Sequence, residues 1–318
     1  MHIFVATLAL LLERLFGYPK PLFDAIGHPV IWMGRLIEAL DRSFNRPELP
    51  HRARTTRGVL ALVLLLLAAG VPALLIALAL RLVPGGWIVE AVLASAMLAQ
   101  KELGRAVRSV ADALDFSLEQ GRKAVAGIVG RDPETLNEAG VARAAIESLA
   151  ESSSDGVVAP LFWLVVFGLP GAVLYKAINT ADSMIGHKSE RYLAFGWASA
   201  RLDDLVNWIP ARLTGLLLVL ACFLVRGARA GAAWETMLSD AKKHDSPNAG
   251  WPEAALAGAL GFTLGGPRSY GGTVHHLPTF GTGRAELAAD DIRRALELYT
   301  AMLNIALGLC VAGCVLVW

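Results

Sequence analysis

The chain is short of charged residues. Only 18% of its 318 residues are Asp, Glu, Lys or Arg, whereas 55% are hydrophobic and the mean hydropathy is +0.50. Soluble domains usually contain about 45–50% apolar and about 25% charged residues, so an ordinary soluble domain is excluded. The charges also balance, with 29 Lys and Arg against 28 Asp and Glu. The balance leaves no electrostatic reason to expect a nucleic-acid partner.

Cysteine is also scarce. The three thiols, Cys222, Cys310 and Cys314, lie inside apolar runs without a His or a further Cys nearby. A structural zinc site needs four such ligands, so we expect small buried side chains instead. The glycines of 258–272 match neither a P-loop nor a dinucleotide fingerprint, because the flanking strands and the GK[ST] ending are missing.

Long apolar runs are what the sequence has in abundance. A run of about 20 apolar residues can cross a bilayer, and we expect membrane segments at 1–16, 58–82, 87–99, 157–175, 208–225 and 296–318. Backbone in lipid must satisfy its hydrogen bonds internally. The sequence therefore predicts an all-α, polytopic integral membrane helical bundle with about five or six membrane segments. The first run lacks the features of a cleaved signal peptide and is expected to be retained.

Basic residues near the ends of these runs predict their orientation. The stretch 45–57 carries four arginines, whereas the turn 83–86 carries none. Because Lys and Arg concentrate in cytoplasmic loops, we expect 45–57 and the helical stretch 101–156 in the cytoplasm. Within the latter, a helix is expected to start at Asp132 and Pro133. The run 87–99 should continue as a helix to about residue 118.

The sequence FGLPG at 167–171 interrupts one apolar run. Discontinuous helices are tolerated where protein shields them or where they line a cavity, so we favour a re-entrant helical hairpin here. The topology of 157–295 stays open as a result. We expect one membrane-embedded domain, 1–318, in which 226–295 forms a polar loop segment.

Carboxylates gather just before the interrupted run. Glu147 and Glu151 share a helical face, and Asp155 follows at the expected helix end. They would repel one another unless a cation or basic group lies among them, so Glu147 and Glu151 are candidate metal ligands. A solvated helix end is the alternative.

A second polar cluster follows the run, at 175–192. Asn179, Asp182 and Ser183 line one face if the helix continues. Such a face suits a Mg²⁺-phosphate group, because Mg²⁺ takes one or two carboxylates plus substrate oxygens. Lys188 and Arg191 could then bind phosphate oxygens. The alternative is a polar patch at a helix boundary.

A third cluster lies in 195–214. Asp203 and Asp204 are each about one helical turn from Asn207, and Arg201 and Arg212 flank them. This pattern predicts a second acidic metal site with guanidinium groups around it. Pairing of the same charges at the level of the lipid headgroups is the alternative.

The fourth cluster precedes a helix start at 251–253. Its polar residues are Asp240, Lys242, Lys243, His244, Asp245, Ser246 and Asn248.

In their order along the chain, these clusters resemble the adenosylcobinamide-phosphate synthase family of cobalamin biosynthesis, the CobD/CbiB family. The matching stretches are 27–41 (GHPVIWMGRLIEALD), 147–163 (ESLAESSSDGVVAPLFW), 175–214 and 240–272. Near the N-terminus the family usually has an acidic run where this chain has ERLFGYP, with Glu13 and Tyr18. Ser152 and Ser153 stand where the family often has Asn-Thr.

The resemblance implies a multi-pass enzyme of the inner (cytoplasmic) cell membrane. It would join aminopropanol phosphate, or aminopropanol, to the propionate carboxyl of adenosylcobyric acid, a corrinoid, and would consume ATP with Mg²⁺. A carboxylate is a poor acyl donor, so it must be activated, most simply as an acyl phosphate, before a neutral amine attacks it. The expected partners are the lipid bilayer and either a second copy of the chain or other membrane enzymes of the late corrin pathway.

Residue chemistry then suggests roles. Metal and phosphate binding falls to Glu147, Glu151, Asp182, Asp203 and Asp204. Phosphates or corrin carboxylates would be held by Lys188, Arg191, Arg201 and Arg212, with Asn179, Ser183 and Asn248 as further polar contacts. His244 or Asp245 is the candidate general base, and Lys188 is the third residue expected to take part in catalysis.

Three other classes stay open. A transporter would also contain broken helices and intramembrane charges, but it should show an inverted repeat, and none is found. A Mg²⁺-dependent membrane phosphotransferase or prenyltransferase would pair two Asp-rich motifs of similar spacing, which 179–182 and 203–207 imitate only loosely. A non-catalytic membrane sensor would be excluded only by an assay.

Overall fold

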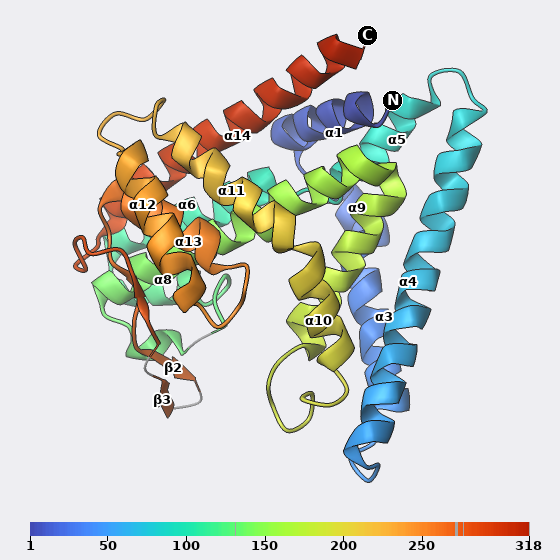
Figure 1. Cartoon of the computed structure of the whole chain (residues 1–318), viewed down its shortest axis with the longest axis horizontal. Helices are drawn as coiled ribbons and strands as arrows, with labels where there is room; N and C mark the ends of the chain where they lie inside the picture. The colour runs from blue at the N-terminus through green and yellow to red at the C-terminus, as the bar shows by residue number, and fades with distance from the viewer. Residues whose placement is uncertain (131, 271–272, 276, 318) are drawn as a thin grey trace. The chain divides into compact units, whose positions relative to one another are not determined.

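The structure, a computed structural model, describes residues 1–130, 132–270, 273–275 and 277–317. In this part of the chain the regular secondary structure is helical apart from four strands of two or three residues (Figure 1). The predicted all-α class is therefore confirmed. The chain divides into two compact units, each assembled from segments that are far apart in the sequence. Each unit is described by itself.

Unit 1 comprises residues 1–99, 159–207 and 310–318. Its complete helices are α1 (His2–Phe16), α2 (Lys20–Ile26), α3 (Pro29–Phe44), α4 (His51–Arg81), α5 (Gly86–Ser95), α9 (Ala159–Ile185) and α10 (Trp197–Val206). Helix α4 packs along α9 and α3, while α1 packs against α5 and α9. Gly70 lets α4 approach α9 closely, because an added Cβ would lie 2.7 Å from the Leu174 side chain.

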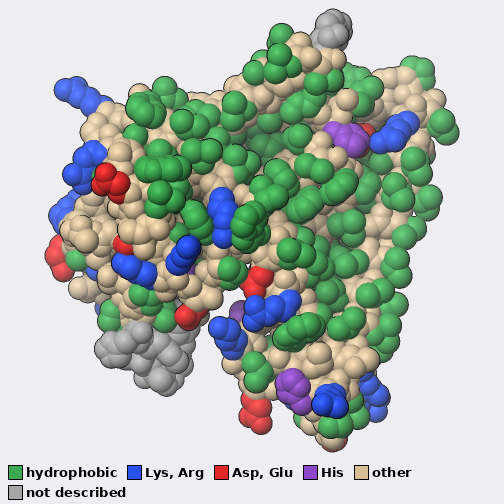
Figure 2. Space-filling view, in the orientation of Figure 1, with side chains coloured by type: hydrophobic (Ala, Val, Ile, Leu, Met, Phe, Trp, Pro, Cys, Tyr) green, Lys and Arg blue, Asp and Glu red, His purple; other side chains and the backbone are tan. Residues whose placement is uncertain are grey.

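Helix α4 confirms the predicted apolar run 58–82 and begins earlier than expected. It starts at His51, so three of the four arginines of 45–57 lie on its first turns and not in a loop. From Val59 to Leu78 the helix exposes large apolar side chains, and Figure 2 shows hydrophobic side chains over α4, with charged ones where the helix begins. This surface is suited to contact with lipid.

By length and composition, three stretches of the described residues could cross a membrane. They are His51–Arg81, Glu138–Ile185 and Ala289–Val317. Two bent helix pairs, His2–Phe16 with Lys20–Phe44 and Trp197–Val206 with Trp208–Ala221, raise the total to five if each pair is counted as one span. These stretches bear out a polytopic membrane bundle.

The run 87–99 is the exception. Helix α5 has 10 residues and ends at Ser95, and the next helix starts only at Gln100. The predicted continuous helix through this region is therefore wrong. At about 1.5 Å per residue α5 is roughly half as long as a bilayer core is thick, so it does not cross by itself.

Helix α9 is broken where FGLPG predicted a break. Gly168 has φ 69° and ψ −159°, and Pro170 follows inside the helix. This conformation is essentially restricted to glycine, and proline has no N–H to donate. The buried Glu90 of α5 accepts a hydrogen bond from the Leu169 N–H at 3.2 Å. The break is confirmed, whereas the re-entrant path stays a prediction.

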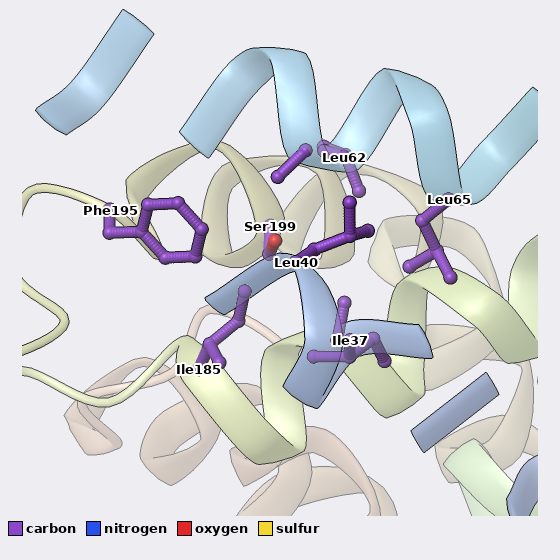
Figure 3. A pocket seen from close by; sticks show the side chains of 9 residues that line it. Ile37, Leu40, Leu62, Leu65, Ile185, Phe195 and Ser199 are labelled. Carbon is purple, nitrogen blue, oxygen red and sulfur yellow. The ribbon is translucent and has the colours of Figure 1, made fainter. Parts of the chain in front are cut away.

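The interior of unit 1 is closely packed. Figure 3 shows a cavity among Ile37, Leu40, Leu62, Leu65, Ile185, Phe195 and Ser199, and its volume is about 10 Å³. One water molecule needs about 10–15 Å³, so this space is a packing gap between α3, α4, α9 and α10. A substrate does not fit there.

Unit 2 comprises residues 100–158 and 208–309. Its α-helices are α6 (Gln100–Phe116), α7 (Leu118–Val125), α8 (Glu138–Ser153), α11 (Trp208–Ala221), α12 (Ala230–Asp240), α13 (Gly250–Leu260) and most of α14 (Ala289–Val317). Short turns are η1 (Pro133–Thr135), the π-helix η2 (Ser154–Val158) and η3 (Ala241–Lys243). Antiparallel strand pairs join β1 (Leu264–Gly265) to β4 (Thr279–Phe280) and β2 (Arg268–Tyr270) to β3 (Thr273–His275).

Helix α13 is the core of unit 2. All of its residues except Trp251 are buried, and α8, α11 and α12 pack against it. The stretch 226–295, predicted as a polar loop segment, therefore contains the helices α12 and α13 and the start of α14 besides its loops and short strands. The sequence of α13 is rich in alanine and glycine, and these small side chains allow helices to approach on every side.

Helix α8 starts and ends differently from the prediction. Asp132 precedes only the single turn η1, while the side chain of Asn137 caps α8 by accepting the Gly140 N–H at 2.8 Å. At the other end α8 continues into η2, so Asp155 lies in a π-helical turn and not at a helix end. Of the cysteines, Cys222 and Cys310 are buried as expected, Cys314 is half-buried, and all three are free thiols.

Candidate functional site

Three carboxylates meet near the end of α9 and on α10 in unit 1. Because α9 stays helical to Ile185, Asn179 and Asp182 lie on one face as predicted. Asp182 lies within electrostatic reach of both Asp203 and Asp204. The structure thus brings together the second and third polar clusters of the sequence.

The carboxylate of Asp203 is the most enclosed of the three. Asn207 Nδ2 donates to Asp203 Oδ2 at 2.9 Å, and the Tyr175 hydroxyl donates to Asn207 Oδ1 at 2.9 Å. Asn179 approaches the same carboxylate, yet the buried Oδ1 of Asp203 accepts no well-formed hydrogen bond within the described residues. Tyr175 was not singled out from the sequence, because nothing local connects it to Asp203.

Basic side chains border this group. Arg201 Nη1 lies 3.0 Å from Asp204 Oδ2, Lys188 is within electrostatic reach of Asp204, and His187 is within reach of Asp182. Lys188 and Ser183 are exposed. The Ser183 hydroxyl donates to its own helix, to Asn179 O at 2.9 Å. The negative charge of Asp203 is therefore buried, whereas the positive charge of Lys188 is accessible to solvent.

The donor set suits a hard divalent cation bound by few protein ligands. Within the described residues no group of three or more His, Cys, Asp or Glu side chains is arranged to hold a metal ion. Mg²⁺, however, usually takes one or two carboxylates and completes its shell with water and phosphate oxygens. Asp182 and Asp203, with the buried Oδ1 of Asp203, fit that requirement. The metal role of the five predicted carboxylates otherwise stays a prediction.

Arg191 has a structural partner that the sequence reading missed. Its guanidinium lies 2.5 Å from Asp41 Oδ2 on α3, and the hydrogen bond to that carboxylate raises the pKa of Arg191 above its ordinary value. Asn45 and Arg54 both donate to the Arg191 carbonyl. These contacts fasten the loop 186–196 to α3 and α4, and the phosphate role of Arg191 stays a prediction.

Glu147 and Glu151 differ in environment although they share a face of α8. Glu147 is 2% exposed, and its Oε1 accepts the Gly265 N–H at 2.6 Å. Glu151, one turn further on, is exposed. Glu147 therefore fastens β1 to α8 inside unit 2. This hydrogen bond favours a structural role for Glu147 over the predicted metal role.

His244 is held inside unit 2. Its Nδ1 accepts the Ser246 N–H at 2.9 Å, its Nε2 lies 3.7 Å from Glu253 Oε1, and its ring stacks on Phe280 with centroids 5.7 Å apart. An accepting Nδ1 places the ring proton on Nε2 in the neutral form. This arrangement favours a positioned histidine over a free general base. Asp245, in contrast, is exposed and has no hydrogen bond or ion pair within the described residues.

Asp240 joins the end of α12 to β4. It accepts from Lys243 Nζ at 2.7 Å, from the Gly281 N–H at 2.8 Å and from Ser239 Oγ at 2.8 Å. Burial would raise the pKa of Asp240, but these hydrogen bonds outweigh it and lower the pKa below its ordinary value. The residue secures the segment that carries His244.

Arg212 lies between two indole rings. Its guanidinium carbon is 4.2 Å from the centroid of Trp208 and 4.5 Å from that of Trp251. Nη1 also donates to Trp208 O at 2.6 Å and to Asn248 Oδ1 at 3.4 Å. Two stacked aromatic faces fix the guanidinium plane. Asn248 and Arg212, both predicted to bind ligand groups, are thus brought together in unit 2.

Comparison with known proteins bears on both units. Residues 6–299 match the family model described as CobD/Cbib protein. A protein of Brucella suis biovar 1 (strain 1330) named cobalamin biosynthesis protein CobD is 49% identical over 317 residues, which cover 98% of this chain and 97% of that protein. The protein of the same name from Rhodobacter capsulatus is 48% identical over 298 residues, 92% of this chain and 91% of the relative.

No solved structure matches the chain. The family model and the relatives both extend over nearly all of it, and the polar clusters of both units lie within the matched residues. The chain belongs to the CobD/Cbib family.

Proposed function

We propose that the protein acts in cobalamin biosynthesis as a membrane-bound adenosylcobinamide-phosphate synthase. It joins aminopropanol phosphate, or aminopropanol, to the free propionate carboxyl of adenosylcobyric acid in an ATP-dependent reaction. The family match over residues 6–299 is the observation that carries this proposal. The apolar helices support a location in the cytoplasmic membrane.

The proposed reaction has two steps. The propionate carboxylate first attacks the γ-phosphorus of ATP, which gives an acyl phosphate and ADP. The amine then attacks the acyl carbon, phosphate leaves, and the amine nitrogen loses a proton to yield the amide. Both steps concentrate negative charge on phosphate oxygens, so the site needs positive groups and a proton acceptor.

The carboxylate group in unit 1 supports a phosphate site. Bound Mg²⁺ would neutralise phosphate charge there, with Asp182 and Asp203 as its protein ligands. Asn207 and Tyr175 orient Asp203 from the interior side. Lys188, which is exposed beside these carboxylates, would bind the transferred phosphoryl group.

The proton acceptor is proposed from the segment around residue 244. Asp245 is exposed and can accept a proton directly or through water. His244 would have to release the Ser246 N–H or turn from Glu253 to do the same. We therefore propose Asp245 ahead of His244 for this role.

The test is amide formation in membranes that contain the protein. Membranes are incubated with adenosylcobyric acid, aminopropanol phosphate and ATP-Mg²⁺, and the product is identified by its mass. A parallel reaction with free aminopropanol distinguishes the two amines. Uptake or binding of substrate without amide product overturns the synthase proposal and favours a transporter.

Asp182→Ala is the informative variant. We expect it to abolish amide formation while the protein still inserts into the membrane, since the side chain is near a helix end and not in the hydrophobic core. Glu190→Ala, which removes an exposed carboxylate from the loop that follows α9, is the matched control and should keep activity. An active Asp182→Ala protein would refute the metal role.

A further inference from the structure

Unit 2 contains a groove whose lining residues lie outside the four polar clusters. Its volume is about 390 Å³. It is open to the surface, and its walls combine charged, polar and apolar side chains from α6, from the turn after α11 and from α14. The residues that matter here are Arg108, Leu224, Arg226, Glu297, Thr300 and Asn304.

Helices α6 and α14, which both line the groove, are fixed against each other at two places. The Tyr299 hydroxyl donates to Gln100 O at 2.9 Å. Toward the other end of α6, Arg293 lies 3.2 Å from Asp112 and also pairs with Asp115. The groove therefore keeps its form without a ligand, as ligand sites commonly do.

The groove has an excess of unpaired positive charge. Arg108 and Arg226 form no hydrogen bond or ion pair within the described residues, whereas Arg105, one turn before Arg108, pairs with Glu102 at 2.9 Å. With Glu297 as the acidic member, two arginines leave the groove a net charge of +1. A ligand with one negative charge complements it.

The position of the groove along α14 indicates what kind of anion that is. Residues 298–317 contain no Asp, Glu, Lys or Arg, and about 20 such residues are enough to cross a bilayer. Glu297 is the last charged residue before this run, so the groove lies where the polar and apolar parts of the helix meet. Leu224, which also lines the groove, is 63% exposed. The exposed apolar surface of this side chain is suited to contact with a lipid acyl chain.

We propose that this groove binds one anionic phospholipid, with its phosphodiester on Arg108 and Arg226 and an acyl chain along Leu224. Guanidinium groups bind phosphate oxygens through charge-assisted hydrogen bonds. Thr300 and Asn304 donate or accept hydrogen bonds, and Glu297 accepts them, so a hydroxylated headgroup such as glycerol is suited to the remaining polar wall. The assignment is independent of the proposed synthase reaction.

The test uses the full chain in a neutral detergent. Native mass spectrometry would count bound lipid during titration with phosphatidylglycerol, phosphatidylethanolamine or inorganic phosphate. We expect one phosphatidylglycerol bound about tenfold more tightly than phosphatidylethanolamine, and an Arg108→Gln/Arg226→Gln protein that binds phosphatidylglycerol about tenfold more weakly than the parent. Equal binding of both lipids, or equal occupancy by inorganic phosphate, overturns the proposal.

Two further variants separate the groove from general surface charge. Arg105→Gln/Lys123→Gln removes the same charge from exposed residues of α6 and α7 that pair with Glu102 and Glu119, and it should bind lipid like the parent protein. Thr300→Phe fills the groove while both arginines remain, and it should also lose lipid. Similar loss in the control pair, or undiminished binding in Thr300→Phe, refutes a site in the groove.

Discussion

The break in α9 leads to a quantitative prediction for Gly168→Ala. With φ 69° and ψ −159°, the residue occupies a region that costs a non-glycine residue about 1–3 kcal/mol. An alanine Cβ would also lie 3.1 Å from His2 Nε2 and 3.2 Å from Glu90 Oε1. Both distances are shorter than ordinary van der Waals contact, so the side chains of His2 and Glu90 must move.

The second contact adds to the backbone strain. Glu90 Oε1 is the acceptor for the Leu169 N–H, and moving it leaves a buried N–H unsatisfied at a cost of about 1–3 kcal/mol. The two effects share the same atoms and do not simply add. We expect Gly168→Ala to lower the free energy of unfolding by about 2–4 kcal/mol.

The assay is equilibrium unfolding in detergent micelles, followed by far-UV circular dichroism, with two glycine controls. Gly85 also has a positive φ, 75°, but an added Cβ meets nothing within 4 Å, so Gly85→Ala reports backbone strain alone, about 1–2 kcal/mol. Gly308→Ala lies in helix α14 with open space around it and should stabilise by about 0.5–1 kcal/mol. If Gly168→Ala unfolds like Gly308→Ala, the reasoning fails.

Three further predictions concern contacts inside each unit. Because hydrogen bonds lower the pKa of Asp240, the stability it contributes is complete above the ordinary aspartate pKa and is lost as the pH falls through the lowered folded-state value; acid unfolding curves of Asp240→Asn should therefore lose this part of the pH dependence, and an unchanged curve would contradict it. Glu147→Ala removes the acceptor of the buried Gly265 N–H and should cost about 1–3 kcal/mol in chemical unfolding, whereas Glu147→Gln, which keeps an acceptor oxygen, should cost less. Asp41→Ala removes the ion-pair partner of the Arg191 side chain, so limited trypsin digestion should cut the loop 186–196 faster than in the parent protein, and equal rates would show that the ion pair does not restrain the loop.

The membrane helices were largely readable from the sequence because long apolar runs carry their own signal. Helices α1, α4 and α14 lie where the apolar runs predicted them, and Gly168 with Pro170 predicted the break in α9. The run 87–99 was predicted wrongly, because its composition is apolar apart from Glu90 while its length is divided by a turn after Ser95. In 226–295, the polar residues favoured the prediction of a loop, although small residues of the same stretch form the core helix α13.

The site was predictable only in its local parts. Helical spacing placed Asn179 beside Asp182 and Asp203 beside Asn207, but their meeting depends on how α9 packs against α10, which no local pattern encodes. Tyr175 was missed for the same reason. Glu90 could have been found, because a lone carboxylate in the apolar run WIVEAVLAS is costly in a membrane without a partner.

The contacts around Arg191 bear on how Lys188 works. The loop is closed at its start by the Gly186 N–H on Asp182 O, at 2.7 Å, and a few residues later Arg191 is fixed to α3 and α4 through both its side chain and its carbonyl. Only a short segment, which contains Lys188, lies between the fixed residues Gly186 and Arg191. Lys188 can turn its own side chain, but the loop cannot swing over a bound molecule as a lid does. Under the proposed function, a phosphorylated substrate would therefore have to come to this amine, and the geometry of the approach would be set before the substrate arrives.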